Sequence, residues 1–249
     1  MKENSPVKDL LRQISKPIIA IENEETTEFR TQESKTSLQP FKAFAPAIPL
    51  ENLGDKTFRN RHGLKYNYVA GAMANGIMSA QMVTAMAENG MLGIFGAGGL
   101  SIDEIERNII DLKNSISGLP FGFNLIHSLA DPDHEMATVD LYLKHGIRLI
   151  SAAAFMRISP ALAYYRVKGI HRDADGRIIA PNRVIAKVSR IEIARQFFSP
   201  PPEKLVNKLL DQGRITREEA ELSQQIPMAQ DLTAEADSGG HTDNRPALT

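Results

Sequence analysis

From Gly63 onward, short apolar segments alternate with helix-start signals, and this alternation limits the fold more than any other feature of the chain. After one apolar segment, Ser101 and Glu104 form the S-x-x-E pattern of a capping box. After another, Asp131 followed by Pro132 supplies an N-cap and a first-turn proline. A strand-length segment followed by a capped helix is a βα unit, and about six such units predict an α/β fold.

These signals place the βα units along the chain. We expect strands over residues 68–71, 92–95, 121–126, 148–152, 184–188 and 232–236. We expect helices over residues 79–89, 101–115, 131–145 and 191–198, and one beginning at residues 159–160. Two insertions interrupt the pattern. The first is a hairpin over about residues 168–182, signalled by Asp175-Gly176, and the second is a helical flap over about residues 199–228 that begins with consecutive prolines.

The number of units alone fits either a doubly wound sheet or most of an eight-stranded barrel. The barrel is favoured because glycine, amide and basic residues follow or close the carboxyl ends of the strands. These are residues 71–75, 96–99, 124–127, 187 and 239–241. In a TIM barrel all of those ends share one rim, where active sites are built. We therefore predict an incomplete TIM (βα)8 barrel over residues 61–249.

Residues 1–60 differ in character and are predicted to form an N-terminal extension and linker. Residues 22–40 begin with the acidic run from Glu22 to Glu28 and continue with Ser, Thr, Gln and Lys, which is too polar to form a packed core. We interpret this segment as a mobile linker. Apolar residues within 10–14 and 18–21 predict a short helix and a strand that dock on the main body.

Composition excludes several classes of partner and site. The 29 basic and 30 acidic residues give a net charge of −1, so no excess charge points to nucleic acid or to an anionic membrane. The chain has no cysteine, which removes thiolate chemistry, and its 6 histidines are not spaced as metal ligands. No apolar stretch reaches the roughly 18 residues of a membrane span, and the N-terminus lacks a signal sequence. We therefore expect a cytoplasmic protein without a metal.

Two runs of small residues are candidates for contact with a cofactor. Gly96-Ala97-Gly98-Gly99 follows a strand and opens a capped helix, so its N–H groups could face an anion or a ring, or its glycines could serve a tight turn alone. It is not a complete dinucleotide fingerprint, because Ser101 stands where the third glycine belongs. Gly71-Ala72-Met73-Ala74 would let a flat ligand approach the backbone, and its methionine is either a soft surface for that ligand or part of the core.

Polar residues at the expected strand ends could carry the chemistry. Asn124 lies among apolar neighbours, so its amide must meet a flavin edge or an ordinary backbone group. Lys187 interrupts an apolar strand and could reach a phosphate, a flavin carbonyl or a carboxylate. His241 follows Gly239-Gly240, and an imidazole titrates near pH ~6.5, so it can supply the proton that accompanies hydride transfer. His127 is a further candidate, although an isolated loop histidine is usually solvated.

Five stretches, taken in order, resemble the PfaD family of trans-acting enoyl reductases. They are residues 64–76 (LKYNYVAGAMANG), 96–100 (GAGGL), 120–125 (PFGFNL), 180–189 (APNRVIAKVS) and 235–246 (EADSGGHTDNRP). The resemblance covers about residues 53–246, and the last stretch is the most specific. This family groups with the nitronate monooxygenases and with the flavin enoyl reductases of bacterial fatty acid synthesis.

The resemblance implies FMN on the barrel rim, NADPH as electron donor, and an enoyl thioester on an acyl carrier protein domain of a polyketide or fatty acid synthase. The residues that it assigns to the flavin are Gly71, Ala72, Met73, Ala74, Gly96, Gly98, Gly99, Asn124, Lys187, Gly239 and Gly240. His241 matches the active-site histidine of the family and is expected to donate the proton in double-bond reduction. A nitronate oxidase that uses the same histidine as a base stays open, as do an inactive or scaffold subunit and a homodimer.

Relatives in this family continue through two more barrel strands, whose loops hold the FMN phosphate, whereas this chain ends at Thr249. A six-stranded barrel would leave open sheet edges and an exposed apolar interior. The sequence therefore leads us to expect weak or absent flavin binding by this chain alone.

Overall fold

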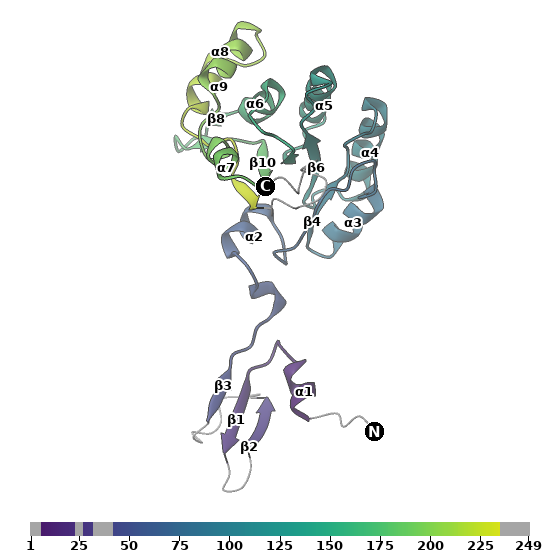
Figure 1. Cartoon of the computed structure of the whole chain (residues 1–249), viewed down its shortest axis with the longest axis vertical. Helices are drawn as coiled ribbons and strands as arrows, with labels where there is room; N and C mark the ends of the chain where they lie inside the picture. Colours follow the sequence, from purple (N-terminus) through teal and green to yellow (C-terminus); the bar gives the residue numbers. More distant parts are fainter. Residues whose placement is uncertain (1–5, 23–26, 32–41, 235–249) are drawn as a thin grey trace. The chain divides into compact units, whose positions relative to one another are not determined.

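The computed structural model describes residues 6–22, 27–31 and 42–234 (Figure 1). The chain divides into two compact units, Met1–Asn67 and Tyr68–Thr249. None of the described helices is long and apolar enough to cross a membrane. In the same residues, no cluster of three or more His, Asp or Glu side chains could hold a metal ion.

The first unit contains a small antiparallel sheet. Its elements are α1 (Pro6–Leu11), β1 (Ile18–Glu22), β2 (Thr27–Thr31), β3 (Ala43–Ala45), the 3-10 helix η1 (Leu50–Asn52) and α2 (Lys56–His62). β1 lies between β2 and β3 and pairs antiparallel with both. The expected short helix and strand are present as α1 and β1, and their docking on the main body stays a prediction. The mobile-linker prediction is wrong for residues 27–31, because backbone pairing with the apolar β1 orders a polar segment that could not fold alone.

The second unit is built on a parallel sheet whose strand order follows the chain. Its strands are β4 (Val69–Ala70), β5 (Leu92–Phe95), β6 (Phe121–Ile126), β7 (Leu149–Ala153), β10 (Arg183–Val188) and β11 (Asp231–Ala234). Each of these strands pairs with the one before it, and all the pairings are parallel. A doubly wound sheet reverses its order at a switch point. The observed order therefore excludes that alternative and confirms the partial TIM barrel.

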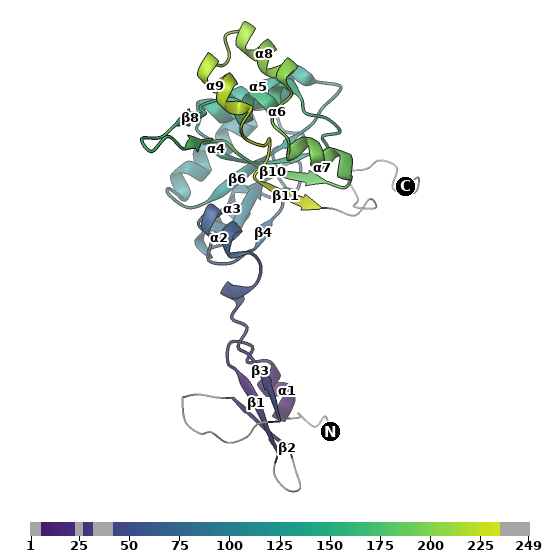
Figure 2. The same cartoon turned by 90° about the vertical axis from the view of Figure 1, so that its left-hand side faces the viewer.

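Helices fan around the outer side of this curved sheet (Figure 1; Figure 2). They are α3 (Ala80–Glu88), α4 (Ile102–Ser115), α5 (Pro132–Lys144), α6 (Pro160–Val167) and α7 (Ile191–Phe197). Right-handed crossovers that always advance in the same direction place every helix on the same face. The start signals predicted at Ser101 and Asp131 are confirmed, because each accepts a hydrogen bond from a first-turn N–H. Ser79 and Ser159 cap α3 and α6 in the same way.

The core lies between the sheet and these helices. Phe123 of β6 packs against Phe95 of β5 and Tyr142 of α5, with ring centroids 5.0 and 5.4 Å apart. Successive side chains of a strand point to opposite faces. Because Phe123 faces the helices, Asn124 and Ile126 face the barrel interior.

Both predicted insertions are present. The hairpin is formed by β8 (His171–Arg172) and β9 (Ile178–Ile179), and the flap by α8 (Glu203–Asp211) and α9 (Arg217–Ser223). Glu219 of α9 joins the two insertions, because its carboxylate accepts hydrogen bonds from the Gly169 N–H at 2.6 Å and from Lys168 Nζ at 3.3 Å.

A buried cation fixes the flap to α6. The Arg166 guanidinium donates to the carbonyl oxygens of Asn182 at 2.7 Å and Pro227 at 2.9 Å. Burial lowers the pKa of Arg166 to about 10. Leu209 of α8 and Leu222 of α9 are buried in the same apolar cluster as the barrel helices. The helical flap is therefore packed as part of the core.

Candidate functional site

A small cavity lies inside the barrel at the carboxyl ends of the strands, and we call it the rim cavity. It is lined by Ala72, Ala74, Asn124, Ile126, Ser151, Ala153, Ala154 and Lys187, and its volume is about 60 Å³. The β6–β7 register places Asn124 beside Ser151 and Ile126 beside Ala153. Four of the residues assigned to the flavin from the sequence, at positions 72, 74, 124 and 187, thus meet around one cavity.

Asn124 connects the rim cavity to the glycine turn. Its Oδ1 accepts hydrogen bonds from the N–H groups of Ala97 at 2.6 Å and Gly98 at 3.2 Å. The ordinary backbone partner considered from the sequence is therefore present for the amide oxygen. Nδ2 has no hydrogen-bond acceptor among the described residues, although the residue is only 5% exposed. Nδ2 is not among the fully buried side-chain atoms that lack a partner, so it is open to the rim cavity and can donate to a ligand oxygen.

Packing accounts for the glycines of residues 96–99. A Cβ on Gly96 would lie 1.7 Å from the Met73 carbonyl oxygen, and a Cβ on Gly98 would lie 2.2 Å from Ile126 Cδ1. Gly99 has a φ of +81°, a left-handed conformation that glycine adopts without strain. The N–H groups of Ala97 and Gly98 point to Asn124. Of the two alternatives for this run, the tight turn is the one that the described contacts support.

The remaining predicted residues do not line the rim cavity. Gly71 and Met73 lie on the loop after β4, and the Met73 side chain is 43% exposed, so it is not part of the core. Gly239, Gly240 and His241 lie outside the described residues.

Ala154 is a rim residue that the sequence did not indicate. It follows β7 with a φ of +63°, in the left-handed region that non-glycine residues rarely adopt. Strained backbone of this kind clusters at ligand sites. Alanine carries no sequence signal for such a conformation, which is set by the surrounding chain.

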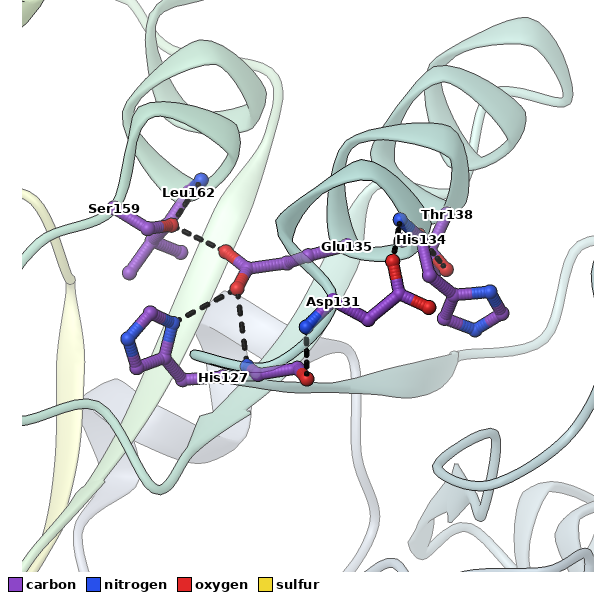
Figure 3. Close-up of polar contacts among 8 residues, drawn as sticks. His127, Asp131, His134, Glu135, Thr138, Ser159 and Leu162 are labelled. Carbon is purple, nitrogen blue, oxygen red and sulfur yellow. Dashed lines mark hydrogen bonds and ion pairs between the residues drawn. The ribbon is translucent and has the colours of Figure 1, made fainter.

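His127 forms a second polar group, on the helix side of β6 (Figure 3). Its Nδ1 lies 2.8 Å from Oε2 of Glu135, which also accepts a hydrogen bond from the Ser128 N–H at 3.3 Å. The Ser159 hydroxyl donates to the other carboxylate oxygen. The imidazole stacks on Phe155 with centroids 5.0 Å apart. The expectation of a solvated loop histidine is therefore wrong, because the side chain is only 11% exposed.

The order of these contacts limits their chemistry. In a nucleophilic triad the hydroxyl bonds to the imidazole, which removes its proton. Here the Ser159 hydroxyl bonds to the carboxylate of Glu135 and also accepts from the Leu162 N–H at 3.1 Å, as the N-cap of α6. Ser159 is therefore not an activated nucleophile. The sequence indicated Ser159 as a cap, but nothing in it indicated that the cap hydroxyl also meets Glu135.

The rim cavity suits the edge of a flat ring that carries carbonyl oxygens, such as the FMN implied by the family resemblance. Ala72, Ala74 and Ala154 present only methyl groups, and Asn124 Nδ2 is an unpaired donor beside them. Ligand pockets usually measure roughly 300–1,000 Å³, so a ring would cover this smaller cavity and not sit inside it. Asn124 and Lys187 are the described residues that could hold the ring.

Comparison with known proteins identifies the family of this chain. The family model for nitronate monooxygenase matches residues 58–221. The polyketide biosynthesis protein PksE of Bacillus subtilis (strain 168) is 44% identical over 203 residues, which cover 81% of this chain and 26% of that protein. A polyunsaturated fatty acid synthase polypeptide of a Thraustochytrium species is 44% identical over 197 residues, which cover 79% of this chain and 13% of that polypeptide. The chain thus spans about a quarter or less of these curated relatives.

A solved structure extends the comparison to the fold. The crystal structure of the enoyl reductase domain of MlnA, from the macrolactin biosynthesis cluster of Bacillus amyloliquefaciens, is 42% identical in sequence, with a TM-score of 0.74. The match covers 80% of this chain and 46% of that one. These relatives support the resemblance to polyketide and polyunsaturated fatty acid enoyl reductases. The nitronate monooxygenase model matches residues 58–221, which is more than half of the chain. This chain therefore belongs to the nitronate monooxygenase family.

Proposed function

We propose that this chain is part of an enoyl reductase that uses FMN and NADPH to reduce an enoyl thioester carried by an acyl carrier protein, in polyketide or polyunsaturated fatty acid biosynthesis. The observation that carries the proposal is the likeness to the MlnA enoyl reductase domain, at 42% identity over 80% of the chain. The rim residues Ala72, Ala74, Asn124 and Lys187 also lie within the stretch that the family model matches.

Each side chain has a distinct part in this reaction. FMN, when bound, supplies the hydride, received from NADPH, that adds to the β carbon of the enoyl thioester. Asn124 donates from Nδ2 to the ring edge, and Lys187 places a positive charge beside it. Ala72 and Ala74 leave room for the ring to approach the backbone. His241 holds the proton that goes to the α carbon, in the role that the family resemblance assigns to it.

The test is oxidation of the reduced flavin under anaerobic conditions. Because weak flavin binding is expected, FMN is added to the protein at saturating concentration. It is then reduced with NADPH and mixed with a crotonyl thioester while the visible flavin absorbance is followed. The proposal expects the thioester to restore the oxidised spectrum, and His241→Ala to slow that step by about 100-fold or more. If a crotonyl thioester leaves the flavin reduced, or if His241→Ala is as fast as the native chain, the corresponding assignment is wrong.

Nitronate oxidation is the second candidate, because the family model that matches residues 58–221 is that of nitronate monooxygenase. It differs in the direction of electron flow: a nitronate reduces FMN, and oxygen reoxidises it. Anaerobic addition of a nitronate to the oxidised protein therefore separates the two. Bleaching of the flavin by a nitronate, without reoxidation by a crotonyl thioester, would favour the second candidate.

A further inference from the structure

A groove lies on the helix side of the barrel, away from the rim cavity, and we call it the outer groove. It opens between the start of α5, the start of α6 and helix α8, and its volume is about 630 Å³. Leu129, Met136 and Leu205 contribute apolar surface, and Leu129 is 74% exposed. The size is within the range of roughly 300–1,000 Å³ for ligand sites.

Unpaired positive charge lies along this groove. The guanidinium of Arg157 and the ammonium of Lys208 line it, both side chains are exposed, and neither has a hydrogen-bond or ion-pair partner among the described residues. Arg214 also lines it but is held by Asp140 at 2.9 Å. The acidic lining groups are Asp133 and the buried Glu135, whose carboxylate is occupied by His127, Ser128 and Ser159. Two cations therefore remain available for an anionic ligand.

His127 adds an unpaired acceptor to the same region. An ionised carboxylate can only accept, so His127 Nδ1 donates to Glu135 Oε2; with a single proton on the ring, Nε2 is then its acceptor. Nε2 is buried and has no hydrogen-bond partner among the described residues. An acceptor left in that state costs about 1–3 kcal/mol. A ligand N–H or O–H that reached it on a small displacement of the groove wall would remove this cost.

The outer groove and the rim cavity each share lining residues with a third cavity. A further cavity of about 530 Å³ is lined by residues 124–128 and by the starts of α4 and α5. It shares Asn124 and Ile126 with the rim cavity, and His127, Ser128 and Glu135 with the outer groove. Residues 124–128, at the end of β6 and just after it, thus contribute to the lining of all three cavities.

We propose that the outer groove binds the phosphopantetheine arm of the carrier protein, with Arg157 and Lys208 on its phosphate and His127 on one of its amide N–H groups. The inference rests on the proposed function, because only a carrier-bound thioester brings this arm. The arm carries one anionic phosphate followed by a chain of two amides and short apolar links. The groove offers the matching sequence of groups: exposed cations, apolar walls and an unpaired buried acceptor.

Calorimetric titration of the flavin-free protein tests the inference. Phosphopantetheine should bind about tenfold or more tightly than pantetheine, which lacks the phosphate. The double variant Arg157→Gln/Lys208→Gln should lose that difference and leave pantetheine binding unchanged. Lys204→Gln, one turn earlier on α8, and Arg217→Gln on α9 remove exposed positive charges that do not line the groove. Both should bind phosphopantetheine like the native chain.

Other outcomes overturn the inference. Equal affinity for phosphopantetheine and pantetheine would show that the groove does not bind the phosphate. Unchanged phosphopantetheine affinity in the double variant would show that Arg157 and Lys208 do not contact it. Displacement of phosphopantetheine by NADPH or by inorganic phosphate at equal concentration would identify a nucleotide or general phosphate site instead.

The same titration separates this inference from the proposed function. If phosphopantetheine binds but no enoyl thioester is reduced, the groove assignment is supported and the proposed function is wrong. Reduction of a phosphopantetheine thioester with the same KM in the double variant as in the native chain would overturn the groove assignment alone.

Discussion

The amide oxygen of Asn124 accepts from the backbone, and its Nδ2 is the proposed donor to the flavin. A single substitution can separate these two roles. Asn124→Asp keeps the oxygen that accepts from Ala97 and Gly98 but replaces the Nδ2 donor with a second acceptor. We expect FMN affinity to fall by about 10- to 100-fold, because a ring oxygen would then face a carboxylate. Fluorescence titration with FMN measures this loss. Urea unfolding of the flavin-free variant should stay close to native, and a large loss of stability there would mean that the amide is structural only.

Glu135 is the centre of the network around His127, so its removal should affect stability. Glu135→Ala leaves the His127 Nδ1, Ser128 and Ser159 donors without their acceptor at a position that is only 3% exposed. We expect the free energy of unfolding to fall by about 3 kcal/mol. Glu221→Ala, at an exposed position of α9, should change it by less than about 0.5 kcal/mol. Equal effects in urea titrations of the two variants would contradict the role of the network.

These two residues show how far single positions could be predicted. Asn124 was predictable because a polar side chain within an apolar strand must find a partner. The contacts of His127 were not, since its partners Glu135 and Ser159 come from the next two helices, and only the packing of α5 against α6 brings them together. The left-handed backbone conformation of Ala154 could not be predicted either, because no sequence pattern marks a strained alanine.

At the level of elements, the glycine turn fixes the position of the loop after β4. A methyl group on Gly96 would lie 1.7 Å from the Met73 carbonyl oxygen, so Gly96→Ala must displace that loop. We expect a loss of about 2–3 kcal/mol in the free energy of unfolding. Gly71→Ala is the matched control, because no atom lies within 4 Å of its added Cβ. It should be neutral or stabilising by up to about 1 kcal/mol. Thermal unfolding of both variants decides the matter, and similar losses would show that the close contact is not the cause.

The capping box of α4 should make stability depend on pH in a defined direction. The Ser101 hydroxyl, and then its backbone N–H, donate to Glu104 and lower the pKa of that carboxyl below 4.5. A lowered pKa in the folded state stabilises the fold above the unfolded pKa and loses this effect as pH falls through the folded value. The difference in Tm between native and Glu104→Gln should therefore be constant from about pH 7 to 5 and shrink below that. Circular dichroism melts across this range measure it, and a difference that grows toward acid pH would have the wrong sign.

The helices were the most predictable elements because their start signals are local. Each cap depends on residues within one turn, such as Ser101 with Glu104 or Asp131 with His134. The strand β2 was missed for the opposite reason. Its residues are polar and become ordered through pairing with β1, a contact that its own composition does not encode.

At the level of the whole molecule, the flap shares the core of the barrel. Leu209 of α8 is 1% exposed within the cluster that also contains Ile109 of α4. We expect Leu209→Ala to lower the free energy of unfolding by about 3 kcal/mol. Hydrogen exchange should then speed up for the amides of α4 as much as for those of α8, because one core unfolds as one unit. Faster exchange confined to α8 and α9 would instead make the flap an independently unfolding segment. Asn207→Ala, exposed on the same helix, is the control.

The strand order carries a consequence for how the second unit is made. Among the described strands of the parallel sheet, β5, β6, β7, β10 and β11 each lie beside the sheet strand that comes before them in the chain, so each pairs with a strand that precedes it. A polypeptide leaving the ribosome can add each βα unit to a partner that has already been synthesised. Biosynthesis and assembly of this sheet can therefore proceed in the same direction, one strand at a time.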